Sequence, residues 1–390
     1  MQTSPTFAPK PHYTLLDALR GLAAILVVWF HLTEFMNPGT WPLFHGYLAV
    51  DFFFGLSGFV IAYAYDSRWA SGLTTGGFLK RRIIRLQPLV FFGMTLGTAL
   101  YYFSGSPMYA GVATTSVGLL LLTSLANAFM IPMLPQWNVR GFGEVTSVNA
   151  PVWSLMYEYV ANLLYALIFR RVSTRVLAIF VALFGLYLID AGMGLDTFGL
   201  GVAGDEYYSL VYGYKFTGQH VYVAMARVLY PFFMGALIAR LLHHRQPAAD
   251  SSWIGRNGYW LTGLLLAAAL AAPRMGEVGS WQEGLYNTLA VLLLFPLILV
   301  LGAKSQLLGQ RTERFCKWLG DISYPLYITH YPIVYVYLAW WDRDREVVSQ
   351  HPDVWWLVMV STFLLCLGVA WAALRLYDLP VRSWLQKHWR

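Results

Sequence analysis

The first apolar run of the chain reads LLDALRGLAAILVVWFH from Leu15 to His31 and stays largely apolar to Phe35. It is long enough to cross a bilayer, yet it contains Asp17, Arg20 and His31. A charged side chain in hydrocarbon costs about 3 kcal/mol, so such residues usually line a cavity. Arg20 and His31 are eleven positions apart, which places them on one helix face, roughly 16 Å apart. We therefore expect one membrane helix to present a cation near one end and an imidazole near the other.

The composition indicates a membrane protein that crosses the bilayer many times. The 390 residues are 57% hydrophobic and 12% charged, whereas a soluble domain carries about 25% charged residues. The net charge of +7 would suit nucleic-acid binding in a soluble protein, but here the basic residues flank apolar spans, which favours positive-inside topology. Two cysteines, Cys316 and Cys366, form no disulfide framework. We predict an all-α transmembrane helical bundle with no nucleic-acid partner.

The apolar runs predict ten crossings in a single membrane domain, residues 15–377, with cytoplasmic tails at 1–14 and 378–390. The predicted spans are 15–35, 47–65, 88–103, 151–169, 176–189, 222–242, 259–272, 286–301, 322–341 and 354–377. Basic residues gather on the inner side of this topology, which supports two cytoplasmic termini. Of the 27 Lys and Arg residues, those expected outside are Arg140, Lys215, Arg227, Arg274, Arg343 and Arg345. The segment 190–220 is then the largest external loop and a candidate floor for an acceptor site.

One further apolar segment, 115–131, does not fit this count. If it crossed the membrane, the arginines at 170, 171 and 175 that follow the span 151–169 would lie outside. We therefore expect this segment to be re-entrant or to lie against the outer face, interrupted by Asn127 and Pro132.

Basic residues near the inner membrane boundary are candidates for anion binding. The densest cluster, KRRIIR at 80–85, is explained by topology alone, but Arg82 and Arg85 are one helical turn apart and could grip a phosphate. Arg20 could likewise only mark the boundary by snorkelling. Its alignment with His31, and Asp17 one turn earlier, favour a role that faces a ligand.

Ionisable residues near the outer boundary are candidates for chemistry. His31 could serve only to hydrogen-bond a neighbouring helix, but an intramembrane histidine is more often functional. Glu34 is three positions on and could orient the imidazole or face water. Asp51 enters the second span at about the depth of His31. The small residues at 55, 57 and 58 need no functional explanation, because they permit close helix packing.

Two later spans add polar side chains. The span that begins Trp153-Ser154 also contains Glu158 and Asn162, so the serine, carboxylate and amide form one stripe at i, i+4 spacing. A buried carboxylate at that depth is more often functional than structural.

The span 322–341 contains two prolines, which kink a helix, with Tyr327 and His330 on a shared face. Close packing of the helix alone would explain Tyr327 and His330. The sequence shows no metal-ligand spacing, Gly-rich nucleotide loop or nucleophile elbow, so no metal is expected.

Together these stretches resemble the acyltransferase 3 family of integral membrane acyltransferases. Each motif is modest alone, but they occur in the family's order across nearly the whole chain. The matching pieces are Arg20 and His31, the run from Asp51 to Phe59, Arg82 and Arg85 before Pro88, Trp153-Ser154-Leu155 with Glu158, and the run from Ser323 to Tyr327 with His330. The resemblance implies transfer of an acyl group, commonly acetyl, from cytoplasmic acyl-CoA (acetyl-CoA) to a hydroxyl of an extracytoplasmic carbohydrate such as lipopolysaccharide. It also implies the bacterial inner membrane.

The residues suggest roles for such a transfer. We expect Arg82 and Arg85 to hold the coenzyme A phosphates, and Arg20 to guide the pantetheine. His31 would act as general base or acyl carrier, with Glu34 beside it. Glu158 and Asp51 would line an outer vestibule, where they position the acceptor hydroxyl or tune His31, with Glu158 counted among the catalytic residues. Ser154, Asn162 and Trp153 would bind the acceptor beside Asp51. Tyr327 and His330 would stabilise the thioester oxyanion.

Other functions remain open at this stage. Charges near the membrane midplane also suit a transporter or flippase, although no inverted repeat is recognisable. A scaffold in polysaccharide export is a further alternative. Since no secreted esterase-like domain follows the last span, a separate extracytoplasmic partner that completes the transfer is also left open.

Overall fold

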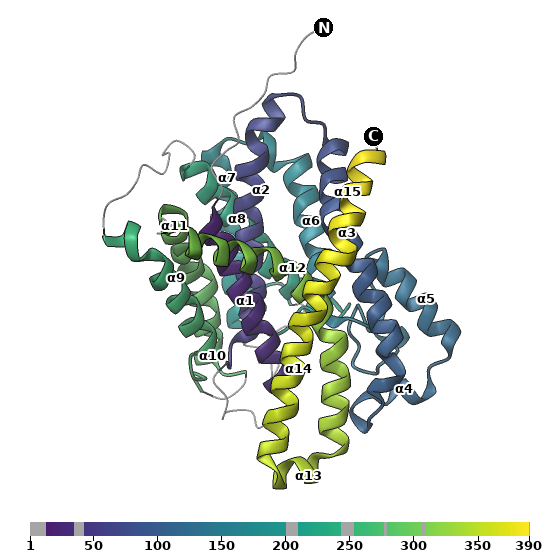
Figure 1. Cartoon of the computed structure of the whole chain (residues 1–390). Coiled ribbons are helices and arrows are strands. Elements are labelled where there is room, and N and C mark those ends of the chain that lie inside the picture. Colours follow the sequence, from purple (N-terminus) through teal and green to yellow (C-terminus); the bar gives the residue numbers. More distant parts are fainter. Residues whose placement is uncertain are drawn as a thin grey trace.

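The structure is a computed structural model that describes residues 13–34, 43–199, 210–242, 253–276, 279–305 and 309–389. The described residues form a bundle of helices without β-strands, which confirms the predicted fold class (Figure 1). Most of the predicted N-terminal tail, the link 35–42 and part of the segment 190–220 lie outside these ranges. The longer helices are α1 Thr14–Thr33, α2 Ala49–Ala70, α3 Thr75–Leu100, α6 Trp153–Leu167, α7 Thr174–Met193, α8 Gly218–Leu242, α9 Trp253–Ala271, α12 Gln310–Arg343 and α14 Pro352–Ala372.

Two helices each continue through a π-helical turn into a second helix. Helix α10 (Trp281–Leu289) passes through Ala290–Leu294 into α11 (Phe295–Lys304), and α14 passes through Ala373–Asp378 into α15 (Leu379–His388). In the described part, eight helices are long and apolar enough to cross a membrane. Helices α9 and α12 account for the remaining predicted spans. Each of the ten predicted spans therefore corresponds to helical structure.

Helix boundaries differ from the predictions in three places. Helix α3 begins at Thr75, capped by the Thr74 hydroxyl, so the basic cluster lies inside the helix and Pro88 does not start it. Helix α12 begins at Gln310 instead of residue 322. The residues expected to form a C-terminal tail continue as α15. These extensions are amphipathic, and an apolar-run criterion therefore stops short of them.

Small residues allow the central helices to approach closely. Helix α1 packs along α12, and α2 packs along α8. A Cβ added at Gly58 would lie 1.8 Å from the Phe232 carbonyl oxygen of α8, and one at Gly235 would lie 1.9 Å from the Gly55 carbonyl oxygen. The packing explanation agrees with these contacts for Gly55 and Gly58, whereas Ser57 donates a hydrogen bond to Glu158 and lines a cavity.

The doubtful apolar segment forms the short helix α5 (Val117–Ala128), which packs beside α3. Its 12 residues extend about 18 Å, less than the ~30 Å hydrocarbon core. This length supports the expectation that the segment does not cross. Asn127 donates hydrogen bonds to the carbonyl oxygens of Ile131 and Val145, 3.0 Å each, and so ties the helix end to the loop that follows.

That loop, residues 129–149, is fastened to α12 by Arg140. The guanidinium lies 3.5 Å from the Tyr335 ring centroid and donates from Nε to the Ser147 carbonyl oxygen at 2.7 Å. Arg140 is fully buried. The loop is thereby held over the same end of the bundle as the beginning of α2. Figure 1 shows the α2–α3 turn and α15 at one end of the molecule, and α13 (Arg345–Gln350) at the other.

Candidate active site

Two cavities open within the bundle. The first, here called the histidine cavity, has a volume of about 380 Å³ and lies beside the C-terminal end of α1. Its polar lining residues are His31, Thr33, Glu34, Tyr47, Glu144, Tyr214, Arg227, Arg274, Tyr327 and Tyr331. Side chains from the loop 129–149 and from Val211 and Tyr214 contribute to its wall. Val211 and Tyr214 belong to the segment 190–220, so described residues of this segment reach the cavity. Its expected role as the floor of an acceptor site stays a prediction.

Within this cavity, His31 contacts one carboxylate and two aromatic rings. Its Nδ1 lies 3.1 Å from Glu34 Oε2, an ion-pair distance without the alignment of a hydrogen bond. The imidazole stacks on His330, with ring centroids 5.5 Å apart, and meets the edge of Tyr331 at 4.6 Å. Glu34 therefore lies where it can orient the imidazole or stabilise its charged form, as expected from the i, i+3 spacing.

His330 lies behind His31 and lines neither cavity. Its ring is fully buried, and Nδ1 lies 3.0 Å from the carbonyl oxygens of both Leu326 and Tyr327. Nδ1 must carry the proton, because its neighbours only accept hydrogen bonds. His330 is therefore absent from the lining of both cavities, and its expected role at the thioester oxyanion stays a prediction. His330 is placed to pack against His31.

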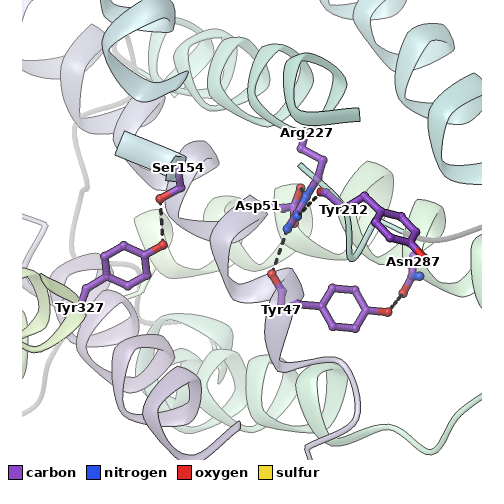
Figure 2. A network of polar contacts seen from close by, with 7 residues as sticks. All are labelled: Tyr47, Asp51, Ser154, Tyr212, Arg227, Asn287 and Tyr327. Atoms are coloured by element: carbon purple, nitrogen blue, oxygen red, sulfur yellow. Dashed lines mark hydrogen bonds and ion pairs between the residues drawn. The ribbon is translucent and has the colours of Figure 1, made fainter. Parts of the chain in front are cut away.

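Asp51 is also absent from the lining of both cavities. Its carboxylate is fully buried against Arg227, with Nη2 2.6 Å from Oδ2, and Arg227 also donates to the carbonyl oxygens of Tyr47 and Tyr212, 3.0 Å each (Figure 2). The prediction that Asp51 lines an outer vestibule is wrong in this respect, because an arginine from α8 occupies its carboxylate. Arg227 itself lines the histidine cavity and lies over the Trp153 ring, 5.3 Å from its centroid.

The second cavity, here called the arginine cavity, has a volume of about 660 Å³. Its charged lining residues are Arg20, Arg81, Arg82, Arg85, Lys317 and Arg382, against Asp17, Glu158 and Asp321. Six basic and three acidic side chains give it a net positive charge. Apolar and aromatic residues of α2 form much of the remaining wall. Such a cavity suits a ligand with an anionic part and an apolar or extended part.

The three predicted arginines all reach this cavity, but their pairing differs. Arg20 donates to Ser323 Oγ at 2.9 Å and lies 3.0 Å from Asp17. Arg82 lies 2.6 Å from Glu158. Among the described residues, Arg85 makes no hydrogen bond or ion pair, and its half-buried side chain lines the cavity.

Glu158 and Asn162 do not lie where the sequence predicted. Glu158 accepts hydrogen bonds from Arg82 and Ser57 in the arginine cavity, at 2.6 Å each, and is absent from the lining of the histidine cavity. Asn162 is buried and donates to the Glu158 carbonyl oxygen at 2.7 Å, within its own helix. Residues at i, i+4 spacing follow one face along the helix axis, so successive members lie at different depths in the membrane. They need not line the same cavity.

The two cavities meet at Val50 and Tyr327, which line both. The Tyr327 hydroxyl lies 2.8 Å from Ser154 Oγ and donates to the Pro151 carbonyl oxygen at 3.0 Å (Figure 2). Trp153 lines the histidine cavity and Ser154 the arginine cavity. Helix α1 therefore presents Arg20 to one cavity and His31 to the other, with a shared wall between them, as the eleven-residue spacing predicted.

Several lining residues were not singled out from the sequence. They are Glu144 and Arg274 in the histidine cavity, and Lys317, Asp321, Arg382 and Gln386 in the arginine cavity. A signal existed for Arg382, because Asp378 precedes it at i, i+4 spacing and Pro380 is typical of a helix start. In the described part of the chain, no group of three or more His, Cys, Asp or Glu residues could hold a metal ion.

The fold and the cavities define a polytopic helical membrane protein with two charged cavities, which share Val50 and Tyr327 as lining residues. Comparison with known proteins identifies the family to which the chain belongs. The profile of the acyltransferase 3 family, described as an acyltransferase domain, matches residues 13–375. The chain therefore belongs to this family, and the resemblance of its motifs is confirmed.

A curated relative supports the assignment. Protein 2 in the picA locus of Rhizobium radiobacter is 32% identical over 195 residues, which cover 47% of this chain and 96% of the relative. No solved structure matches the chain. The protein is thus an acyltransferase-family protein of the membrane.

Proposed function

We propose that the protein transfers an acyl group, in the simplest case acetyl, from cytoplasmic acyl-CoA to a hydroxyl of an extracytoplasmic carbohydrate. The observation that carries the proposal is the meeting of the arginine cavity and the histidine cavity at Val50 and Tyr327. A donor with an anionic nucleotide and a long thin thioester arm matches this pair of cavities. Its phosphates suit the arginines, and its arm would extend past Tyr327 toward His31.

The donor end of this scheme relies on Arg82 and Arg85. Arg85 is without a hydrogen-bonding partner among the described residues, and the buried Nε of Arg82 is also unpartnered. Unpaired buried donors are costly, at about 1–3 kcal/mol each, so these groups favour an anionic ligand. Arg20 already donates a hydrogen bond to Ser323 and pairs with Asp17. In our proposal it would contact the pantetheine arm of the donor.

The acceptor end relies on His31. In the general-base route, the imidazole takes the proton of the acceptor hydroxyl while the oxygen attacks the thioester carbonyl. The carbon–sulfur bond then breaks, and the thiolate of coenzyme A receives the proton. In the covalent route, the imidazole attacks the thioester carbonyl, and the carbon–sulfur bond breaks to release the thiolate of coenzyme A. The acceptor hydroxyl then attacks the acyl-imidazole, the carbon–nitrogen bond breaks to free His31, and the hydroxyl proton passes to the thiolate. Glu34 would stabilise the imidazolium in the first route.

Of the two residues that line both cavities, Val50 and Tyr327, Tyr327 is the one with a polar side-chain group, its hydroxyl. It already donates to the Pro151 carbonyl oxygen, and Ser154 Oγ lies beside it. A turn of either hydroxyl toward the passage would provide a hydrogen bond for the thioester oxygen as charge develops on it. These two hydroxyls therefore take over the oxyanion role in our proposal, in place of Tyr327 with His330.

The test supplies inverted membrane vesicles with radiolabelled acetyl-CoA and measures label in the carbohydrate fraction. We expect transfer by the wild type and a loss of about 10²-fold or more for His31→Ala. The matched control is His351→Ala, which removes an exposed histidine that lines neither cavity. Full activity of correctly folded His31→Ala would contradict the proposal. Rapid quench of the wild type would detect an acylated histidine only in the covalent route.

A further inference from the structure

We propose that the C-terminal helix α15 is part of the donor site and that Arg382 binds a phosphate of the acyl donor. The inference rests on the proposed function and adds a residue that lies after the family match, which ends at residue 375. It therefore concerns a feature of this chain beyond the matched acyltransferase domain.

The first argument is position. Arg382 and Gln386, one helical turn apart, both line the arginine cavity together with residues of α2 and α3. Helix α15 packs against α3, and the Lys80 ammonium lies 5.3 Å from the Trp389 ring centroid at the end of the chain. Figure 1 shows α15 beside the upper part of α3. The helix is thereby held as a wall of the cavity.

The second argument is unused hydrogen-bonding capacity. Arg382 donates from Nη1 to Asp378 Oδ2 at 3.0 Å, but its buried Nε has no hydrogen-bond partner. The buried Nε of Arg82 is in the same state, and Arg85 makes no hydrogen bond or ion pair with the described residues. Three guanidinium groups with free donors thus line one cavity. A phosphate has three acceptor oxygens and can bridge such a set.

The third argument is charge. Arg382, Arg20 and Arg82 exert the main electrostatic repulsion on the Arg85 guanidinium, and the Asp378 carboxylate acts in the opposite direction. Like charges gathered in a partly enclosed cavity repel one another unless an anion compensates them. A simple i, i+4 pair between Arg382 and Asp378 would stabilise α15 without requiring the other arginines to be near. The clustering favours a ligand over a purely structural pair.

The experiment compares two thioester donors with purified full-length protein in a neutral detergent without anionic lipid. Acetyl-CoA carries the phosphates, whereas S-acetylpantetheine presents the same thioester arm without them. For Arg382→Gln we expect the KM for acetyl-CoA to rise about tenfold or more, which is typical of losing a charge-assisted hydrogen bond. The kcat with acetyl-CoA and the KM for S-acetylpantetheine should stay near their wild-type values. Arg382→Lys, which keeps the charge but loses the planar fork, should restore part of the affinity.

Two further variants make the test decisive. Lys387→Gln removes an exposed basic residue of the same helix that does not line the cavity, and it should leave both KM values unchanged. Gln386→Glu places a negative charge in the cavity at an exposed position and should raise the KM for acetyl-CoA alone, even if Arg382→Gln fails to fold.

Unchanged kinetics in both cavity variants, or an equal rise in KM for both donors, would overturn the role of Arg382 and leave the proposed function intact. Absence of acetyl transfer from either donor by the wild type would instead overturn the proposed function itself.

Discussion

The guanidinium of Arg82 lies 2.6 Å from the carboxylate of Glu158, and the same carboxylate oxygen accepts a hydrogen bond from Ser57 at 2.6 Å. One ion pair thus joins α2, α3 and α6 at the wall of the arginine cavity. A donor phosphate that binds Arg82 must compete with this carboxylate. Under the proposed function, Glu158 would therefore weaken donor binding and favour release of coenzyme A after transfer.

The first prediction concerns this competition. Glu158→Gln keeps the side-chain shape but removes the negative charge, so coenzyme A should bind about fivefold more tightly, equivalent to about 1 kcal/mol. Arg82→Gln should weaken binding. Isothermal titration calorimetry with the purified protein measures both. Glu313→Gln, which neutralises an exposed carboxylate outside the cavity, should have no effect. Weaker binding by Glu158→Gln would show that the carboxylate assists the donor.

The second prediction concerns the buried pair of Asp51 and Arg227. Asp51→Ala leaves a fully buried guanidinium without its carboxylate, so stability should fall by about 3–5 kcal/mol. Asp51→Leu combined with Arg227→Met should recover much of this loss, because both buried charges are then removed. Thermal unfolding in detergent provides the measurement. Arg345→Ala, which breaks an exposed pair with Asp342, should change stability by about 1 kcal/mol or less. A small loss for Asp51→Ala would contradict the structural role.

The third prediction concerns the contact between α2 and α8. Gly58→Ala would place a Cβ 1.8 Å from the Phe232 carbonyl oxygen, so the two helices must separate. We expect a loss of about 1–3 kcal/mol or more from this overpacking. Gly368→Ala in α14 is the matched control, since nothing lies within 4 Å of its added Cβ. That change should be neutral or stabilising by about 1 kcal/mol. Equal thermal stability of the two variants would disprove the close contact.

The fourth prediction concerns pH. Burial raises the pKa of the Glu144 carboxyl in the loop over the histidine cavity, while the hydrogen bond from Asn138 and the charges of Arg140 and Lys215 act in the opposite direction. Because the folded pKa exceeds the unfolded value of about 4.3, the stabilising contribution is complete below that pH. It is lost as the pH rises through the folded pKa. Glu144→Gln should therefore raise the melting temperature at pH 8 and raise it less at pH 4.

Melting curves over this pH range provide the check. Glu346→Gln, at an exposed position in α13, should leave the pH dependence of the wild type unchanged. A Glu144→Gln variant whose melting temperature follows the wild type at every pH would show that the carboxyl ionises without cost.

Much of the candidate site was visible in local patterns. The spacing of Arg20 and His31 follows from helix geometry alone, and the positions of Arg82 and Arg85 follow from their one-turn separation. Partners contributed by distant elements were not visible. Arg227 is 176 positions from Asp51 and forms an ion pair with its carboxylate, and Arg82 forms an ion pair with the carboxylate of Glu158. Such pairings depend on which helices are neighbours, which periodicity within one helix does not encode.

The amino-acid sequence by itself determined the helical membrane class, the positions of the apolar helices and the family, because apolar length and motif order are local properties of the chain. Only the tertiary structure decided which charges remain available to a ligand. Pairing across helices occupies the Asp51 carboxylate and holds Glu158 at the arginine cavity, while burial within α12 keeps His330 out of the lining of both cavities. The physical reason is that a buried charge must find a partner, and the partner is chosen by packing.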